Sequence, residues 1–143
     1  LTHLVGSPVV TVSAQQATGT SADSEDIVSI NLGFADGSIA TVHYFSNGAK
    51  ALPKERCEVF FDGNVLQMNN FKTVKGFGKA KLGRRAPATR QEKGHKEQFA
   101  AVVQSLRSGS GAPIAFGELV NVAQASFAAL DSIRGGGQVH ELS

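Results

Sequence analysis

The chain has 143 residues, of which 41% are hydrophobic and 18% are charged, and its formal net charge is +2. This is the composition of a single globular domain long enough to bury a core, and it contains no apolar run of the roughly 18 residues that a membrane helix needs. The single cysteine, Cys57, excludes an internal disulfide and fits a reducing compartment, so we expect a cytoplasmic protein with no membrane partner.

The first residues have the pattern of a helix end. Leu1, Leu4 and Val5 recur at helical spacing, Gly6 stands where a C-terminal cap belongs, and Pro8 follows it. No methionine precedes them. We therefore interpret the chain as a piece of a longer protein, with the rest of this helix upstream of Leu1.

Strands are expected next, each bounded by turn residues. The β-branched run Val9–Gln15 predicts the first of them. Two Asp-Gly pairs, Asp36-Gly37 and Asp62-Gly63, predict hairpins because both central residues of such tight turns need positive φ. The remaining strands are expected over 27–35, 38–45, 55–61, 64–69 and 71–77. Short connections between six strands predict an antiparallel sheet.

The hairpin over Ile27–Phe45 gives a prediction about the two faces of the sheet. With a two-residue loop, Phe34 is expected opposite Ile39 and Val28 opposite Phe45, and all four would face the helices. The other face would then carry Ala40, Val42 and Tyr44. We expect helices to leave that second face uncovered.

Two helices are expected after the strands. A stripe of Phe99, Val102, Val103 and Leu106 predicts a helix over 91–107. A second helix is expected over 117–134, with inward residues Leu119, Val120, Val122, Ala123, Phe127, Leu130 and Ile133. An edge strand over 139–142 would follow it. Strands first and helices after indicate a single α+β domain over residues 1–143, an open, mainly antiparallel sheet of about six strands with helices packed on one face.

Basic residues are concentrated between Lys72 and Lys96. This segment holds nine Lys and Arg against Glu92, a charge of 9 − 1 = +8, whereas the rest of the chain carries 5 − 11 = −6. One interpretation is a solvated strand and loop whose lysines discourage aggregation. The alternative is an autonomous binding module that uses the 72–96 stripe for phosphorylated or acidic ligands. No nucleic-acid partner is expected, because a helix-turn-helix and an aromatic stacking pattern are both missing.

Histidines are the natural acid–base candidates near neutral pH. His43 falls on the expected apolar face, which favours a packed core histidine over a catalyst. His95 opens a helix beside several cations and is the histidine best suited to touch a ligand. The sequence has no nucleophile elbow, phosphate loop, dinucleotide fingerprint, paired-carboxylate motif or metal-spaced Cys/His cluster. It therefore does not look like a complete enzyme, and a small enzyme built on His43 or His95 is the weakest alternative.

Several segments, in order along the chain, are similar to one known family. They are the helix end LTHLVGSPVVTVSA, the hairpins INLGFADGSIATVHYF and PKERCEVFFDGNVLQMNNF, and the helical segments RQEKGHKEQFAAVVQSLRSG and PIAFGELVNVAQASFAALDSIRGG. Together they resemble the C-terminal domain of the glucose–fructose oxidoreductase / inositol dehydrogenase / MocA family of NAD(P)-dependent oxidoreductases, in its two-domain, WbpB-like branch. The ordered set carries the resemblance rather than any single motif.

The resemblance implies a division of roles. In that family an N-terminal Rossmann domain binds NAD or NADP and supplies a catalytic lysine in a Glu-Lys-Pro motif. A His-x-x-Asp pair completes the site and would precede Leu1, so His3 does not match the catalytic histidine. This chain would shape the pocket for a sugar-like substrate and assemble subunits through the open sheet face. Its implied partners are the missing Rossmann domain and a second copy, and it would hold no cofactor itself.

Polarity and position within the resemblance give the candidate site residues. Those expected to contact substrate are Ser46, Asn47, Lys50, Lys54, Arg90, Lys93 and His95. Those expected to form the oligomer face are Ala40, Val42 and Tyr44. We expect no catalytic, cofactor-binding or metal-binding residue in the chain.

Overall fold

The structure is a computed structural model that describes residues 1–17, 26–79, 91 and 93–142. Its elements are α1 (Thr2–Val5), β1 (Val9–Gln16), β2 (Ile27–Phe34), β3 (Ile39–Phe45), β4 (Arg56–Phe61), β5 (Asn64–Asn69), β6 (Thr73–Phe77), α2 (His95–Ser108), α3 (Phe116–Arg134) and β7 (His140–Glu141). The chain divides into two compact units, Leu1–Gly48 with Gly109–Ser143, and Ala49–Ser108. Each unit has its own sheet, and the single domain stays a prediction.

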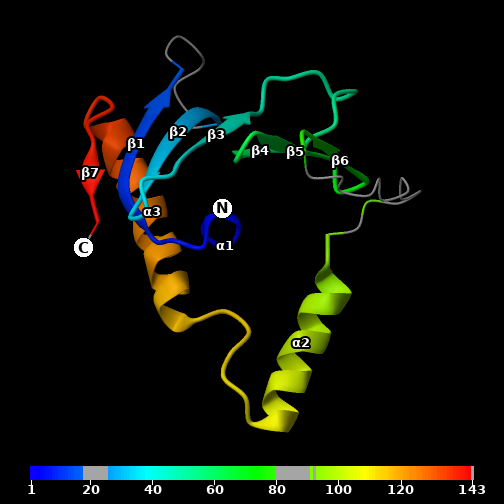
Figure 1. Cartoon of the computed structure of the whole chain (residues 1–143). Helices are drawn as coiled ribbons and strands as arrows, with labels where there is room; N and C mark the ends of the chain where they lie inside the picture. Colours follow the sequence, from blue (N-terminus) through cyan, green and yellow to red (C-terminus); the bar gives the residue numbers. More distant parts are fainter. Residues whose placement is uncertain (18–25, 80–90, 92, 143) are drawn as a thin grey trace. The chain divides into compact units, whose positions relative to one another are not determined.

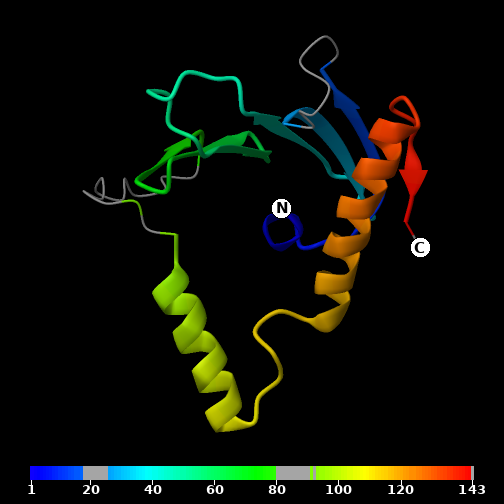
Figure 2. The same ribbon diagram turned by 180° about the vertical axis from the view of Figure 1, so that it is seen from behind.

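The first unit is an antiparallel sheet with the strand order β3-β2-β1-β7. Figures 1 and 2 both show α3 running beside β1, with β7 at the sheet edge. Val12 and Ala14 of β1 are 0% exposed, and they pack with Phe34 and a set of small residues on α3. The core of this unit is therefore the layer between β1 and α3.

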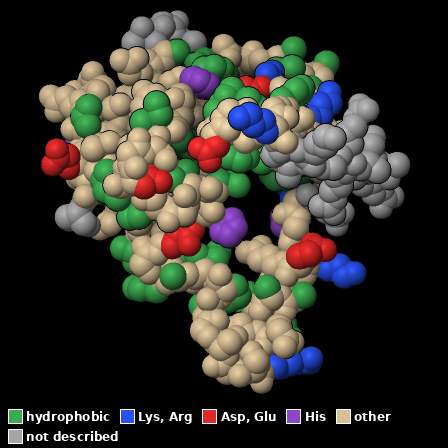
Figure 3. Space-filling view, viewed as in Figure 1, with side chains coloured by type: hydrophobic (Ala, Val, Ile, Leu, Met, Phe, Trp, Pro, Cys, Tyr) green, Lys and Arg blue, Asp and Glu red, His purple; other side chains and the backbone are tan. Residues whose placement is uncertain are grey.

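The face of α3 that contacts the sheet differs from the predicted one. Its buried residues are Ala125, Ala128, Ala129 and Ser132, whereas Leu119 is 51% and Phe127 65% exposed. Small side chains let the helix backbone approach β1 closely enough for polar side chains of α3 to reach the strand. Ile133 packs against the core, as predicted, whereas Val120 and Val122 lie at the surface with Leu119 and Phe127. Figure 3 shows that hydrophobic side chains, in green, are exposed on the face in view.

The register of the central hairpin also differs from the prediction. The two-residue loop is wrong, since Phe34 N–H donates to the carbonyl of Ser38 across a three-residue loop that contains Gly37 at φ 86°. Such a loop, with its last residue in the left-handed region, is a common hairpin connection. It shifts the pairing by one residue, so Ile30 lies opposite Val42 rather than His43.

This shift moves the three residues predicted for the uncovered face. Ala40, Val42 and Tyr44 pair with Leu32, Ile30 and Val28, so they share the face of the sheet on which α3 packs. Ala40 contacts the hydrophobic core directly. Their predicted placement is therefore wrong, and Ile39, Thr41, His43 and Phe45 occupy the face opposite α3.

The second unit is an antiparallel sheet with the order β4-β5-β6, together with α2. The Asp62-Gly63 hairpin between β4 and β5 is confirmed, with both residues at positive φ. Helix α2 begins at His95, four residues later than expected, and none of its residues is buried. The α+β class and the antiparallel pairing are confirmed, but the predicted strands belong to two hydrogen-bonded sheets. In the described part of the chain no helix has the length and apolar character needed to cross a membrane.

Candidate functional site

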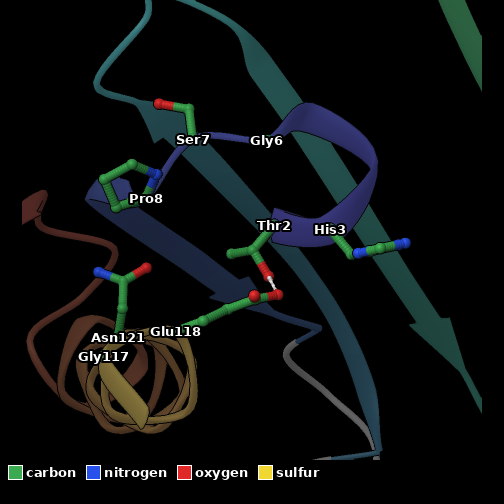
Figure 4. Close-up of a pocket in the computed structure, with 8 residues that line it drawn as sticks. All are labelled: Thr2, His3, Gly6, Ser7, Pro8, Gly117, Glu118 and Asn121. Carbon is green, nitrogen blue, oxygen red and sulfur yellow. Dashed lines mark hydrogen bonds between the residues drawn. The ribbon is translucent and has the colours of Figure 1, made fainter. Parts of the chain in front are cut away.

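A cavity of about 320 Å³ lies in the first unit, where α1 leads into β1 and the first turns of α3 pass beside it. Its lining, drawn in Figure 4, is Thr2, His3, Gly6, Ser7, Pro8, Gly117, Glu118 and Asn121. Gly6 ends α1 in the left-handed region at φ 75°, which turns the chain toward β1. The cavity is therefore built by a helix cap and a helix start, both of which expose backbone polar groups.

Hydrogen bonds hold most polar side chains of this cavity in place. Thr2 Oγ1 donates to Glu118 Oε1 at 3.1 Å, and Ser7 Oγ accepts from the N–H of Asp36 at 3.2 Å. The side-chain amide of Asn121 accepts from the N–H of Val9 and donates to its carbonyl. In Figure 4 the ring of His3 points away from the Glu118 carboxylate, so the two form no acid–base pair. The lining suits hydroxyl groups of a small polar ligand rather than proton transfer.

Among the described residues, no group of three or more His, Cys, Asp or Glu side chains could hold a metal ion. His43, predicted on the apolar face, lies instead on the face opposite α3, where its Nδ1 is 2.8 Å from Ser29 Oγ. His95 is the first residue of α2. Neither histidine is placed beside a carboxylate by a hydrogen bond or ion pair of the described chain.

The predicted substrate residues are divided between the two units. Ser46 and Asn47 follow β3 in the first unit, whereas Lys50, Lys54, Lys93 and His95 belong to the second. Arg90 lies outside the described residues. Of the described candidates, Lys54 and Lys93 both act on Glu55, which directly precedes β4.

Glu55 is the centre of a polar network in the second unit. Lys93 Nζ lies 2.6 Å from Glu55 Oε1, and Gln91 Nε2 donates to Glu55 Oε2 at 3.1 Å and to Asn70 Oδ1 at 2.9 Å. The hydrogen bond from Lys93 lowers the pKa of the Glu55 carboxyl below its usual value, and the Lys54 charge adds to this. Lys93, predicted as a substrate contact, is thus paired with a carboxylate that ties the segment before α2 to the sheet.

This pairing predicts a pH-dependent contribution to stability. Because the pKa of Glu55 is lowered in the folded state, its stabilising effect is present above the unfolded value, near 4.5, and is lost as the pH falls below it. We expect Glu55→Gln to be less stable than the original chain at pH 7 but equally stable at low pH, by chemical denaturation at each pH. The effect should be small and should shrink with salt, since the pair is solvent-accessible.

The matched control is Asp26→Asn, an exposed carboxylate directly before β2 for which no ion pair is seen in the described chain. It should leave stability unchanged across the same pH range. A stability gap between Glu55→Gln and the original chain that stays constant from neutral to acidic pH would contradict the assigned role of the Glu55–Lys93 pair.

Comparison with known proteins gives the class of fold. No family model and no curated protein matches the chain. Solved structures do match it, and those that share its fold are oxidoreductases of the glucose–fructose oxidoreductase, inositol dehydrogenase and MocA type. The fold implied by the sequence resemblance is therefore confirmed.

Three of these structures illustrate the match. The aldose-aldose oxidoreductase of Caulobacter crescentus, solved with glycerol, is 18% identical with a TM-score of 0.74, over 99% of this chain and 43% of its own. The WlbA dehydrogenase of Bordetella pertussis, solved with NADH and UDP-GlcNAcA, is 22% identical with a TM-score of 0.61. This match covers 100% of this chain and 41% of the dehydrogenase. The UDP-N-acetylglucosamine 3-dehydrogenase GnnA of Acidithiobacillus ferrooxidans is 12% identical with a TM-score of 0.72. This match covers 94% of this chain and 43% of GnnA. This chain thus spans less than half the length of these proteins.

Sequence reasoning did not find the cavity residues on α3 or the Asn121 contact with β1. Glu118 and Asn121 stand near the start of a helix whose hydrophobic residues dominated the pattern. The available signal was the polar residue Asn121 in line with Ala125, Ala128 and Ser132, at the spacing of one helix face. A polar residue on an otherwise small and apolar stripe indicates a side chain with a backbone partner.

Proposed function

We propose that this chain is the substrate-side and assembly part of an NAD(P)-dependent oxidoreductase acting on a sugar-like substrate. The observation that carries the proposal is the match to the aldose-aldose oxidoreductase, which extends over 99% of this chain but only 43% of that protein. A fold by itself does not determine an activity, so the proposal also uses what the matched proteins bind. NADH and a UDP-sugar are bound in one, and UDP-N-acetylglucosamine is named as the substrate of another.

In this proposal the nicotinamide cofactor and the catalytic residues belong to a Rossmann domain that is a partner of this chain. The remaining candidates for substrate contact are Ser46, Asn47, Lys50, Lys54, Arg90 and His95. Lys93 is assigned instead to the ion pair with Glu55. Lysine and hydroxyl side chains on loops are suited to bind the hydroxyls and charged groups of a carbohydrate derivative.

The activity is tested with the product of the whole gene, incubated with NAD or NADP and a panel of aldoses and UDP-sugars. We expect reduction of the nicotinamide, followed by absorbance, with at least one member of the panel. The 143-residue chain alone is the control, and it should neither reduce the cofactor nor bind NADH. Cofactor reduction by the 143-residue chain, or a whole-gene product that does not bind NADH, would overturn the proposal.

The proposed assembly surface is the face of the first sheet opposite α3. On β1, β2 and β3 this face carries His43 but no Asp, Glu, Lys or Arg. It exposes large hydrophobic side chains, with Ile39 86% and Phe45 54% exposed. At the edge of the sheet, β7 adds Glu141, which pairs with Thr11 of this face. A partly apolar sheet face that carries its charge only at this edge is suited to pack against the same face of a second copy around a two-fold axis. The surface therefore consists of Ile39, Thr41, His43 and Phe45 rather than Ala40, Val42 and Tyr44.

Two lysine substitutions on adjacent residues of β3 test this surface. Thr41→Lys places a charge on the face opposite α3, and we expect it to convert a dimer into a folded monomer in light scattering at micromolar concentration. Val42→Lys, one residue along, places the charge on the α3 side and should lower stability instead. A monomeric original chain, or a Thr41→Lys variant that keeps the dimer mass, would contradict the proposed surface.

A further inference from the structure

The turn between β5 and β6 holds an aromatic residue in an unusual backbone conformation. Asn70 and Phe71 have φ values of 52° and 54°, and Lys72 N–H donates to the carbonyl of Asn69 at 3.0 Å to close the turn. Positive φ at both central residues is a requirement of the type I′ turn, which favours Gly at the second of them. A bulky side chain there is a steric outlier that needs a reason.

The neighbouring hairpin of the same sheet shows what the fold uses elsewhere. Its turn also has positive φ at both central residues, Asp62 at 44° and Gly63 at 74°. Glycine occupies the second position there, at no steric cost. The same position in the β5–β6 turn is Phe71, so this turn departs from the arrangement that stability alone would favour.

Contacts from three segments hold Phe71 in this conformation. Asn70 N–H donates to the carbonyl of Glu55 at 2.6 Å, and Phe71 N–H donates to Met68 Sδ at 3.1 Å. The ammonium of Lys93, itself fixed by Glu55, lies 5.8 Å from the centroid of the Phe71 ring. Strain that is held in place by its surroundings is concentrated at ligand-binding positions in proteins.

The ring is presented rather than buried, and its surroundings are basic. Phe71 is 40% exposed. Lys72 follows it in the turn, Lys93 lies over the ring, and Lys54 acts electrostatically on Glu55. The three lysines and Glu55 give 3 − 1 = +2, so the segments that meet at this turn carry an excess positive charge beside an accessible aromatic ring. That combination is suited to a ring that stacks and an anion beside it.

We propose that the β5–β6 turn is a binding site for a phosphorylated ring compound, whose ring stacks on Phe71 and whose phosphate is bound by Lys54 and Lys72. The proposal goes beyond the oxidoreductase assignment, because it concerns a site complete within this chain and can fail or hold independently of it. It also gives Lys72, the first residue of the basic segment, a specific task. The ring can be the base of a nucleotide or the pyranose of a sugar phosphate.

Calorimetric titration of the 143-residue chain with UDP, glucose 1-phosphate and inorganic phosphate tests the site. We expect at least one ring phosphate to bind about tenfold more tightly than inorganic phosphate, the gain that one stacking contact provides. Tighter binding of UDP would identify a nucleotide site, and tighter binding of glucose 1-phosphate a sugar phosphate site. Equal binding of all three would overturn the proposal.

Phe71→Gly separates a binding role from a packing role. Glycine suits the positive φ, so we expect the melting temperature of this variant to stay level or rise, while the affinity for the ring phosphate falls about tenfold. Phe71→Trp should keep the affinity, and Phe60→Ala, which removes a 71% exposed aromatic from the same sheet, should not change it. A Phe71→Gly variant that is destabilised, or that binds as the original chain does, would show that the ring serves packing only.

Discussion

Replacing Phe34 with Ala should lower the free energy of unfolding by about 3 kcal/mol or more, the usual cost of removing a buried aromatic side chain. Phe34 ends β2, is 3% exposed and belongs to the core with Val9 and the alanines of α3. Domains of this size are stable by only about 5–15 kcal/mol, so the loss is a large share of the total. The urea midpoint, followed by circular dichroism, measures it.

Phe45→Ala is the matched control, because it also tests the register of the hairpin. The sequence-based register placed Phe45 on the same face as Phe34, whereas the structure places it opposite α3 at 54% exposure. In the monomeric Thr41→Lys background, where the proposed assembly surface is unpaired, we therefore expect it to cost under about 1 kcal/mol, as for other substitutions away from a core. Equal losses of unfolding free energy from Phe34→Ala and Phe45→Ala would contradict the observed β2–β3 pairing and support the pairing predicted from the sequence.

Replacing Ser132 or Asn121 with Ala should each cost about 2 kcal/mol, although neither side chain is hydrophobic. Ser132 is 0% exposed, accepts from Ala14 N–H at 2.8 Å and donates to the Gln138 carbonyl at 2.6 Å. Asn121 bonds the N–H and C=O of Val9 at 2.9 and 2.8 Å. Truncation leaves buried backbone groups of β1 without a hydrogen-bond partner. The full desolvation penalty of those groups is then lost from the stability of the folded state.

Ser126→Ala is the control for these substitutions. Ser126 lies on the same helix and is exposed, and its hydroxyl donates to the carbonyl of Val122 four residues earlier. This bond goes to a carbonyl of the same helix, whereas those of Ser132 and Asn121 satisfy backbone groups of β1. We therefore expect the free energy of unfolding to change by no more than about 0.5 kcal/mol. A loss from Ser126→Ala as large as that from Ser132→Ala would mean that helix propensity, rather than the strand edge, explains the effect.

The elements themselves could be predicted from the sequence because their signals are local. Turn residues such as Asp62-Gly63 and β-branched runs such as Val9–Gln16 specify hairpins and strands within a few residues. The ordered set of segments was enough to indicate the oxidoreductase fold, which the solved structures confirm.

The face of the sheet on which each β3 residue lies could not be predicted in the same way, because a shift of one residue in the strand pairing moves every side chain to the other face. Asp36-Gly37 is compatible with a two-residue and with a three-residue loop, and the choice moves Val42 from one face to the other. On α3, the hydrophobic pattern favoured Leu119 and Phe127, but packing against β1 selected the small residues and Ser132. The polar network around Glu55 joins this residue to Gln91 and Lys93, which are 36 and 38 residues further along the chain, and no local pattern reveals such contacts.

The coding DNA immediately upstream of Leu1 decides whether this chain is part of an NAD(P)-dependent oxidoreductase. The oxidoreductase assignment requires a strand–GxGxxG–helix unit there, then a Glu-Lys-Pro motif, and a His-x-x-Asp pair just before this chain, in the same reading frame. Finding them would place the nicotinamide cofactor and the catalytic residues in the preceding domain. An unrelated domain or a start codon directly before Leu1 would contradict the assignment and leave the Phe71 turn as the leading functional site of the chain.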